Sequence, residues 1–101
     1  MDPRRLPVEE WAEIHAAYSN PKRIELMLAL YSDKELSFKR LKEKLKLGSA
    51  TLDYHLTLLE KSGLVENRLE RRSDTISQYR LSEKGRKILK TSVRLLEERS
   101  V

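Results

Sequence analysis

Apolar residues in this chain recur mainly three or four positions apart, which is the spacing of one face of an α-helix. The pattern predicts five helices, and residues suited to start a helix precede three of them. Asn20 stands before Pro21, a residue favoured in the first helical turn, while Ser37 and Ser82 precede the third and fifth segments. The expected helices span about residues 8–18, 21–31, 38–46, 49–62 and 83–99.

The fourth segment, together with the turn before it, is the most informative part of the chain. Leu52, Leu56 and Leu59 fall on one helical face, and Gly63 is placed to end the helix. The helix starts with small and hydroxyl-bearing residues, so its backbone can come close to another surface, such as a DNA major groove. The positions expected to face outward are Ala50, Thr51, Tyr54, Thr57 and Lys61.

The segments 64–70 and 75–81 are typical of two strands joined by a hairpin turn at residues 71–74. Residues 32–35 are expected to form a loop. Three helices, a turn, a fourth helix, a hairpin and a last helix make a winged helix-turn-helix. We therefore predict a fold that is mainly α with a small β-hairpin, in one domain over residues 1–101, with the helix-turn-helix at 37–62 and the wing at 64–81.

The charge of the chain is positive and unevenly distributed. The 101 residues include 21 Lys or Arg and 16 Asp or Glu, so the net charge is +5. Residues 1–36 hold five basic and seven acidic side chains, whereas residues 37–101 hold sixteen and nine. This excess around the fourth helix suits a phosphate backbone, and for charge alone a solvated surface accounts for it equally well.

The composition also disfavours several classes of protein. The chain has no cysteine, which excludes disulfides and thiolate metal sites, and His15 and His55 lie in no metal-binding pattern. Neither a bilayer-spanning run nor a signal-peptide core is present in the sequence, so we expect a cytosolic protein. Catalytic and phosphate-loop motifs are also missing, so we expect no enzyme and no cofactor. The 37% of charged residues, with few amides, favours a heat-adapted source.

Three motifs, in this order and at this spacing, resemble the winged-helix transcription regulators of the ArsR-like and MarR-like superfamily. They are Asn20–Leu26, similar to the opening of the family's second helix; Thr51–Val65, similar to its recognition helix; and Tyr79–Gly85, similar to the end of its wing. The likeness covers about residues 19–89. It implies a winged-helix fold and a transcription regulator that binds DNA.

One departure from the family pattern bears on metal sensing. Metal-sensing members carry two cysteines, one residue apart, at the start of the third helix, and the matching positions here are Ser37 and Lys39. Other sensors use Asp and His on the last helix, which here has no histidine and, after Glu83, only the acids Glu97 and Glu98. The resemblance therefore carries over DNA binding without metal sensing, and the sequence identifies no effector.

The outward face of the fourth helix supplies the candidate base contacts. A Thr51 methyl can meet a thymine methyl, and the Thr51 and Tyr54 hydroxyls can donate or accept hydrogen bonds. Ser49 can bind a phosphate or simply cap the helix. Asp53 can accept from a cytosine amine, but we favour a role in stabilising the helix dipole from the first turn. The predicted base-contacting residues are Ser49, Ala50, Thr51, Asp53, Tyr54 and Thr57.

Basic residues supply the candidate backbone contacts. Arginines on the hairpin can enter a narrow minor groove, or can only solubilise an exposed turn. Lys22 is a candidate phosphate contact, whereas Arg23 next to it is expected to form an internal salt bridge. For His55 a packed, hydrogen-bonded position is favoured, and a bridge between core and phosphate is the functional alternative. The predicted backbone and wing residues are Lys22, Lys39, His55, Arg68, Arg71, Arg72 and Arg80.

The first and last helices carry more apolar surface than the short central elements can cover. We favour a homodimer interface formed by both helices, and the alternative is that they pack on each other within one chain. The residues assigned to this interface are Trp11, Ile14, Tyr18, Val93, Leu95 and Leu96.

The sequence as a whole predicts a homodimeric transcription regulator that binds double-stranded DNA and acts as a repressor. The alternative is a winged-helix module that contacts protein or RNA through the same surface. Such modules usually lack both a small, polar start to the fourth helix and a basic wing.

Overall fold

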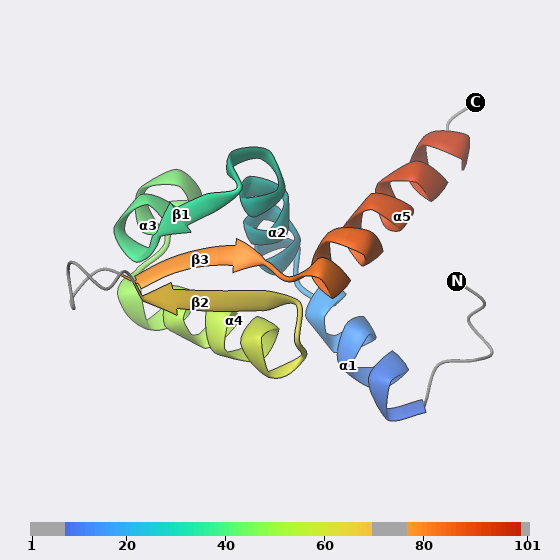
Figure 1. The fold of residues 1–101 in the computed structure, drawn as a ribbon, viewed down its shortest axis with the longest axis horizontal. Helices are drawn as coiled ribbons and strands as arrows, with labels where there is room; N and C mark the ends of the chain where they lie inside the picture. The colour runs from blue at the N-terminus through green and yellow to red at the C-terminus, as the bar shows by residue number, and fades with distance from the viewer. Residues whose placement is uncertain (1–7, 70–76, 100–101) are drawn as a thin grey trace.

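The computed structural model describes residues 8–69 and 77–99, and in these ranges the chain forms five helices and three strands (Figure 1). Residues 1–7, 70–76 and 100–101 are not described further. In chain order the elements are α1 (Val8–Tyr18), α2 (Pro21–Asp33), β1 (Glu35–Ser37), α3 (Phe38–Leu45), α4 (Ser49–Lys61), β2 (Val65–Leu69), β3 (Ser77–Leu81) and α5 (Glu83–Arg99).

Local capping explains where most of the helices begin. The Asn20 side chain accepts a hydrogen bond of 2.8 Å from the Lys22 amide at the start of α2. The Ser37 hydroxyl accepts one of 3.1 Å from the Arg40 amide at the start of α3. The Ser82 hydroxyl accepts one of 2.9 Å from the amide of Gly85 at the start of α5. All three predicted caps are confirmed.

Ser49 does not cap α4, so the capping alternative for Ser49 is wrong. Gly48 is the N-cap residue, with φ −72° and ψ 160°, and Ser49 is already the first helical residue. Before it, Lys46 closes α3 in the left-handed conformation with φ 55°. The reversal at Lys46 and the extended Gly48 together make the tight turn of the helix-turn-helix.

The strand β1 corrects the prediction of a loop at residues 32–35. Helix α2 continues to Asp33, and Glu35–Ser37 then pair with β3, with Leu36 opposite Tyr79. The sheet is antiparallel in the order β1-β3-β2. A three-residue strand is too short to show an alternating pattern, and its partner lies more than forty residues further along the chain. The sequence pattern therefore did not predict β1.

The core lies between the helices and one face of the sheet. Helix α2 runs through its centre, with Leu26, Met27 and Leu30 at 0% exposure. The predicted inner face of α4 is confirmed, and its leucines are fully buried. Burial of one such side chain stabilises the fold by about 1.5–3 kcal/mol. The leucines of α4 at 1% exposure or less are Leu52, Leu56 and Leu59.

Close backbone contact joins the end of α4 to the start of α5. The Ser82 amide donates to the Leu64 carbonyl oxygen over 3.0 Å, and the Ser82 hydroxyl donates to the Gly63 carbonyl. A Cβ atom on Gly85 would lie 2.2 Å from the Leu64 carbonyl oxygen, so only glycine fits there. This contact gives a physical reason for the glycine that ends the Tyr79–Gly85 motif.

The two terminal helices lie at the end of the molecule opposite the end of β2 and the start of β3 (Figure 1). Helix α1 packs mainly on α2, and α5 packs mainly on α2 and β3. The two helices splay apart in Figure 1. None of the helices described is both long and apolar enough to span a membrane.

Candidate nucleic-acid interface

Helix α4 presents a small, polar outer face on the side away from the core. Ser49, Ala50 and Thr51 are all exposed, and the Tyr54 side chain follows them with 60% of its surface exposed. Asp53 is exposed and Thr57 is half-buried. Five of the six residues that the sequence assigned to base contacts are therefore exposed on α4, and the sixth, Thr57, is partly accessible.

The first turn of α4 has no side-chain cap. Gly48 offers no acceptor to the free amides at the start of the helix, so water or an anion must satisfy them. A Cβ atom placed on Gly48 would meet nothing within 4 Å, so the space in front of this turn is open. The helix dipole also favours negative charge at this point. These features suit a backbone phosphate.

Asp53 does not lie in the first turn of α4, so the favoured role of stabilising the helix dipole from that turn is wrong. Because α4 begins at Ser49, Asp53 lies beyond the first turn, where the interaction of a carboxylate with the helix dipole is weak. Its charge acts on another residue of α4 instead. Burial raises the pKa of Glu60 above its ordinary value, and the charge of Asp53 raises it further. Asp53 remains available to a base amine.

Helix α3 carries the basic surface beside α4. Its outer face holds Lys39 and Arg40, both exposed, and its last turn adds Lys42 and Lys44. Lys44 forms an ion pair with Asp33 at the end of α2. Lys39 is an exposed cation on the first helix of the helix-turn-helix, which is compatible with its predicted phosphate contact.

The described part of the wing carries two of its predicted arginines. Arg68 lies 3.7 Å from the Glu35 carboxylate, and the Arg80 guanidinium donates to Glu66 over 2.8 Å. Such exposed pairs contribute about 0.2–1 kcal/mol, so a phosphate can compete for either arginine. Lys22 on α2 is similar, because its exposed ammonium lies 3.1 Å from Glu25. Arg71 and Arg72 lie outside the described residues.

Arg23 and His55 are both buried, which confirms the packed position favoured for His55 and changes the expectation for Arg23. Arg23 is 7% exposed and makes hydrogen bonds to carbonyls, a hydroxyl and an imidazole, where a salt bridge was expected. His55 is 5% exposed, and its Nδ1 lies 3.1 Å from Arg23 Nη1. The packed alternative therefore describes His55, and its burial argues against a phosphate contact. Sequence reasoning missed this pair, although the cation at the unfavourable start of α2 was a signal.

The structure places the predicted dimer residues on the two terminal helices but describes few of their side chains. Tyr18 is half-buried against the core at the end of α1. The backbones of the other five residues lie in α1 and α5, and their side chains lie outside the described part of the structure. These five residues are Trp11, Ile14, Val93, Leu95 and Leu96.

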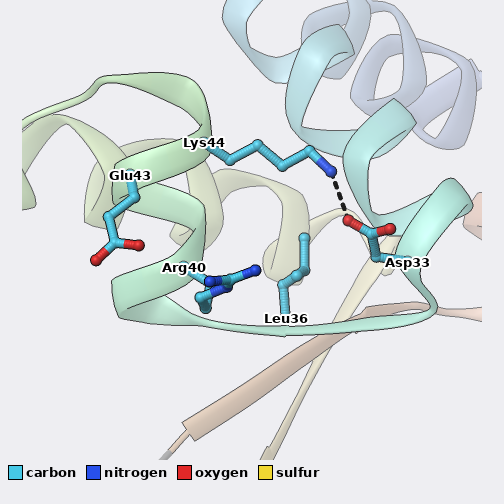
Figure 2. A pocket seen from close by; sticks show the side chains of 5 residues that line it. All are labelled: Asp33, Leu36, Arg40, Glu43 and Lys44. Carbon is cyan, nitrogen blue, oxygen red and sulfur yellow. Dashed lines mark hydrogen bonds and ion pairs between the residues drawn. The ribbon is translucent and has the colours of Figure 1, made fainter.

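A small pocket lies between the end of α2, strand β1 and helix α3 (Figure 2). Its volume is about 350 Å³, and Leu36 forms its apolar part. The Arg40 side chain extends across it, while Glu43 points away and Lys44 reaches Asp33. Charges of both signs line the pocket, so it favours no single ligand chemistry. The described residues contain no cluster of His, Asp or Glu that could hold a metal ion.

Comparison with known proteins decides the family. The family described as "Winged helix DNA-binding domain" matches residues 22–100. The chain belongs to this family. The match confirms the predicted fold and the resemblance to winged-helix transcription regulators. The family is one of DNA-binding domains and not of enzymes.

Individual relatives agree with this assignment. The "Uncharacterized HTH-type transcriptional regulator YdgJ" of Bacillus subtilis (strain 168) is 34% identical over 70 residues, which are 69% of this chain and 43% of YdgJ. This chain thus spans less than half the length of that relative. The structure of HlyU from Vibrio cholerae N16961 is 26% identical with a TM-score of 0.73, over 94% of this chain and 97% of HlyU.

A third relative shares the fold over nearly the whole chain. It is the homodimeric winged helix-turn-helix DNA-binding domain of Mb0332 from Mycobacterium bovis, a possible ArsR-family transcriptional regulator. The TM-score is 0.82 at 21% identity, over 98% of this chain and 89% of that one. At this identity the likeness supports the fold alone.

Proposed function

We propose that this protein is a sequence-specific transcription regulator that binds double-stranded DNA as a homodimer and acts as a repressor. Helix α4 enters the major groove with Thr51 and Tyr54 on base edges. The uncapped start of α4 and Lys39 on α3 contact phosphates, and the wing contacts the backbone at the side.

The outer face of α4 is the observation that carries this proposal. Most large side chains of a small domain are needed for its core, yet Tyr54 is 60% exposed beside exposed residues too small to block a close approach. A major groove about 12 Å wide admits a helix, and the face that enters it must offer hydrogen-bonding groups without bulk. The outer face of α4 meets both needs.

Dimerisation through α1 and α5 is supported by their placement. Both helices lie at the end of the molecule opposite the end of β2 and the start of β3, α1 packing on α2 and α5 packing on α2 and β3 (Figure 1). Both helices therefore lie at one end of the molecule, where a second copy could pack against them. Two recognition helices related by a twofold axis read half-sites about 34–36 Å apart, and a dimer bound over a promoter occludes it without any further domain.

Selection of bound duplexes from a random pool, followed by fluorescence anisotropy at several salt concentrations, tests this function. We expect one enriched, inverted-repeat sequence, and an affinity for it that falls as salt rises. Failure to enrich any duplex at low salt contradicts the proposal. Enrichment of a structured RNA in a parallel pool would favour the alternative of an RNA-binding module.

Two substitutions separate base reading from phosphate binding. Tyr54→Ala removes a group facing the bases, so we expect about 1–3 kcal/mol less discrimination against altered sites, with the salt dependence unchanged. Lys39→Ala removes one phosphate contact, so all duplexes should bind more weakly and the salt slope should fall by about 1. Lys34→Ala, at an exposed lysine between α2 and β1, is the matched control. The reverse pattern would exchange the two roles.

A further inference from the structure

A polar cluster is buried where three helices meet. Arg23 on α2 and His55 on α4 are 7% and 5% exposed, although both side chains can carry charge. A buried cation destabilises a fold unless hydrogen bonds compensate for its lost hydration. Burial of this pair costs free energy of hydration. The hydrogen bonds that offset this cost therefore indicate the role of the pair.

One guanidinium connects α4 to the end of α1. Arg23 Nη1 lies 3.1 Å from His55 Nδ1, while Nη2 and Nε donate to the carbonyl oxygens of Ala16 and Ala17 over 3.0 and 3.2 Å. Nη2 also donates to the Ser19 hydroxyl over 3.1 Å. The last carbonyls of a helix lack helical partners and carry the negative end of its dipole. The end of α1 therefore takes the place of a carboxylate in balancing Arg23.

The chemistry of the contact fixes the state of His55. A guanidinium can only donate, so Nδ1 must accept and the imidazole is neutral with its proton on Nε2. The planar fork of arginine serves several acceptors in fixed directions, which a lysine ammonium cannot reproduce. The direction of the His55 ring, and with it the rotation of α4, is tied to the end of α1.

His55 also lies next to the base-reading face. It follows Tyr54 directly on α4, and the two ring centroids are 5.6 Å apart. A change in the position of His55 therefore moves Tyr54 relative to the groove. A displacement well below the width of a base pair is enough to lose a hydrogen bond, because these bonds weaken steeply with angle and distance.

We infer that Arg23 and His55 are positioning residues for DNA recognition, which lock the recognition helix α4 to the C-terminal end of α1. This inference rests on the proposed function. It adds that the orientation of α1 and the base-reading face of α4 are coupled through one hydrogen-bonded unit. Anything that reorients α1, dimerisation included, changes how α4 reads DNA.

The test compares variants of both residues by anisotropy on the selected duplex and on a scrambled one. His55→Leu removes the acceptor, whereas His55→Asn keeps an acceptor at the δ position and serves as the matched control. We expect His55→Leu and Arg23→Lys to lower the affinity for the selected duplex about tenfold or more. Affinity for the scrambled duplex and both salt slopes should stay unchanged, because neither residue contacts phosphate. His55→Asn should bind within about threefold of the original protein.

A second measurement keeps the test decisive if DNA binding itself fails. Amide shifts in NMR spectra of the full chain should change in α4 for Arg23→Lys, and at residues 16–19 for His55→Leu, but little for His55→Asn. Folded variants in which α4 and the end of α1 respond independently would overturn the inference, as would equal DNA binding by His55→Leu and His55→Asn. If the original protein selects no duplex while the amide shifts follow expectation, the proposed function fails and the coupling between the helices stands.

Discussion

The two helices of the helix-turn-helix are anchored alike in the core, but they differ in the capping of their first turn and in the side chains of their outer face. Leu41 on α3 and Leu56 on α4 are both buried, at 0% and 1% exposure. The first turn of α3 is closed by the Ser37 hydroxyl, whereas that of α4 follows Gly48 and has no side-chain cap. The outer face of α3 carries long basic side chains, whereas the outer face of α4 begins with short polar ones.

This difference shows how one motif divides its work. Long cations suit contact with phosphates across variable distances, while small polar side chains on a rigid helix suit fixed contacts with bases. The missing cap leaves amide donors at the one helix start that is proposed to meet an anion. The first turn of α4 therefore lacks the stabilisation of a cap, which a bound phosphate can replace, whereas the first turn of α3 is stabilised by its own cap.

The largest expected effect tests the shared anchoring. Leu56→Ala and Leu41→Ala each leave a cavity in the same core, so each should lower the free energy of unfolding by about 2–5 kcal/mol. Chemical denaturation followed by circular dichroism measures both. A cost below 1 kcal/mol for either would mean that its helix is not held by the core as the structure indicates.

The cap of α3 gives the next effect. Ser37→Ala removes the hydroxyl that accepts from the Arg40 amide, and we expect a loss of about 1 kcal/mol in the free energy of unfolding. Ser37→Asn restores a capping acceptor and is the control. Equal stability of all three proteins would show that the caps of the two helices do not differ in energy.

A change of pH tests the inner face of α4 alone. Burial lowers the pKa of His55 below its ordinary value, and the neighbouring Arg23 guanidinium lowers it further. The unfolded chain therefore takes up a proton near pH 6.5 while the folded protein does not, so stability is full above that value and declines as the pH falls towards the folded pKa. Denaturation midpoints between pH 7.5 and about 5 follow this, since ordinary carboxylates titrate lower. Glu60, whose pKa is raised, acts in the opposite direction, because it gains a proton more readily in the folded protein. The decline should be smaller in His55→Asn, and an equal decline would assign it to other groups.

The smallest effect tests the open start of α4. Gly48→Ser supplies a cap where a Cβ atom meets nothing within 4 Å, so the free energy of unfolding should rise by about a few tenths of a kcal/mol. DNA affinity should fall, because the hydroxyl occupies an amide proposed for phosphate. Gly48→Ala adds the same bulk without an acceptor and separates the two causes. Unchanged affinity in both variants would remove the start of α4 from the interface.

Much of the candidate site could be predicted because its residues follow one another on one helix. The outward positions of α4 and its buried leucines follow from a rotation of 100° per residue, and both are confirmed. The roles of single residues were less predictable. The roles of Asp53 and Ser49 depended on whether Gly48 or Ser49 is the N-cap of α4. Such boundaries are set by cap geometry, which sequence patterns locate only approximately.

The sequence by itself determined the helices, their caps at Asn20, Ser37 and Ser82, and the faces they bury, since each depends on residues within about two helical turns. Only the tertiary structure decided which distant segments meet. It paired β1 with β3, brought Arg23 to His55 across 32 positions, and set Gly85 against the Leu64 carbonyl. These contacts form through space between segments that carry no shared local pattern. The joint between α1 and the recognition helix is therefore a property of the fold.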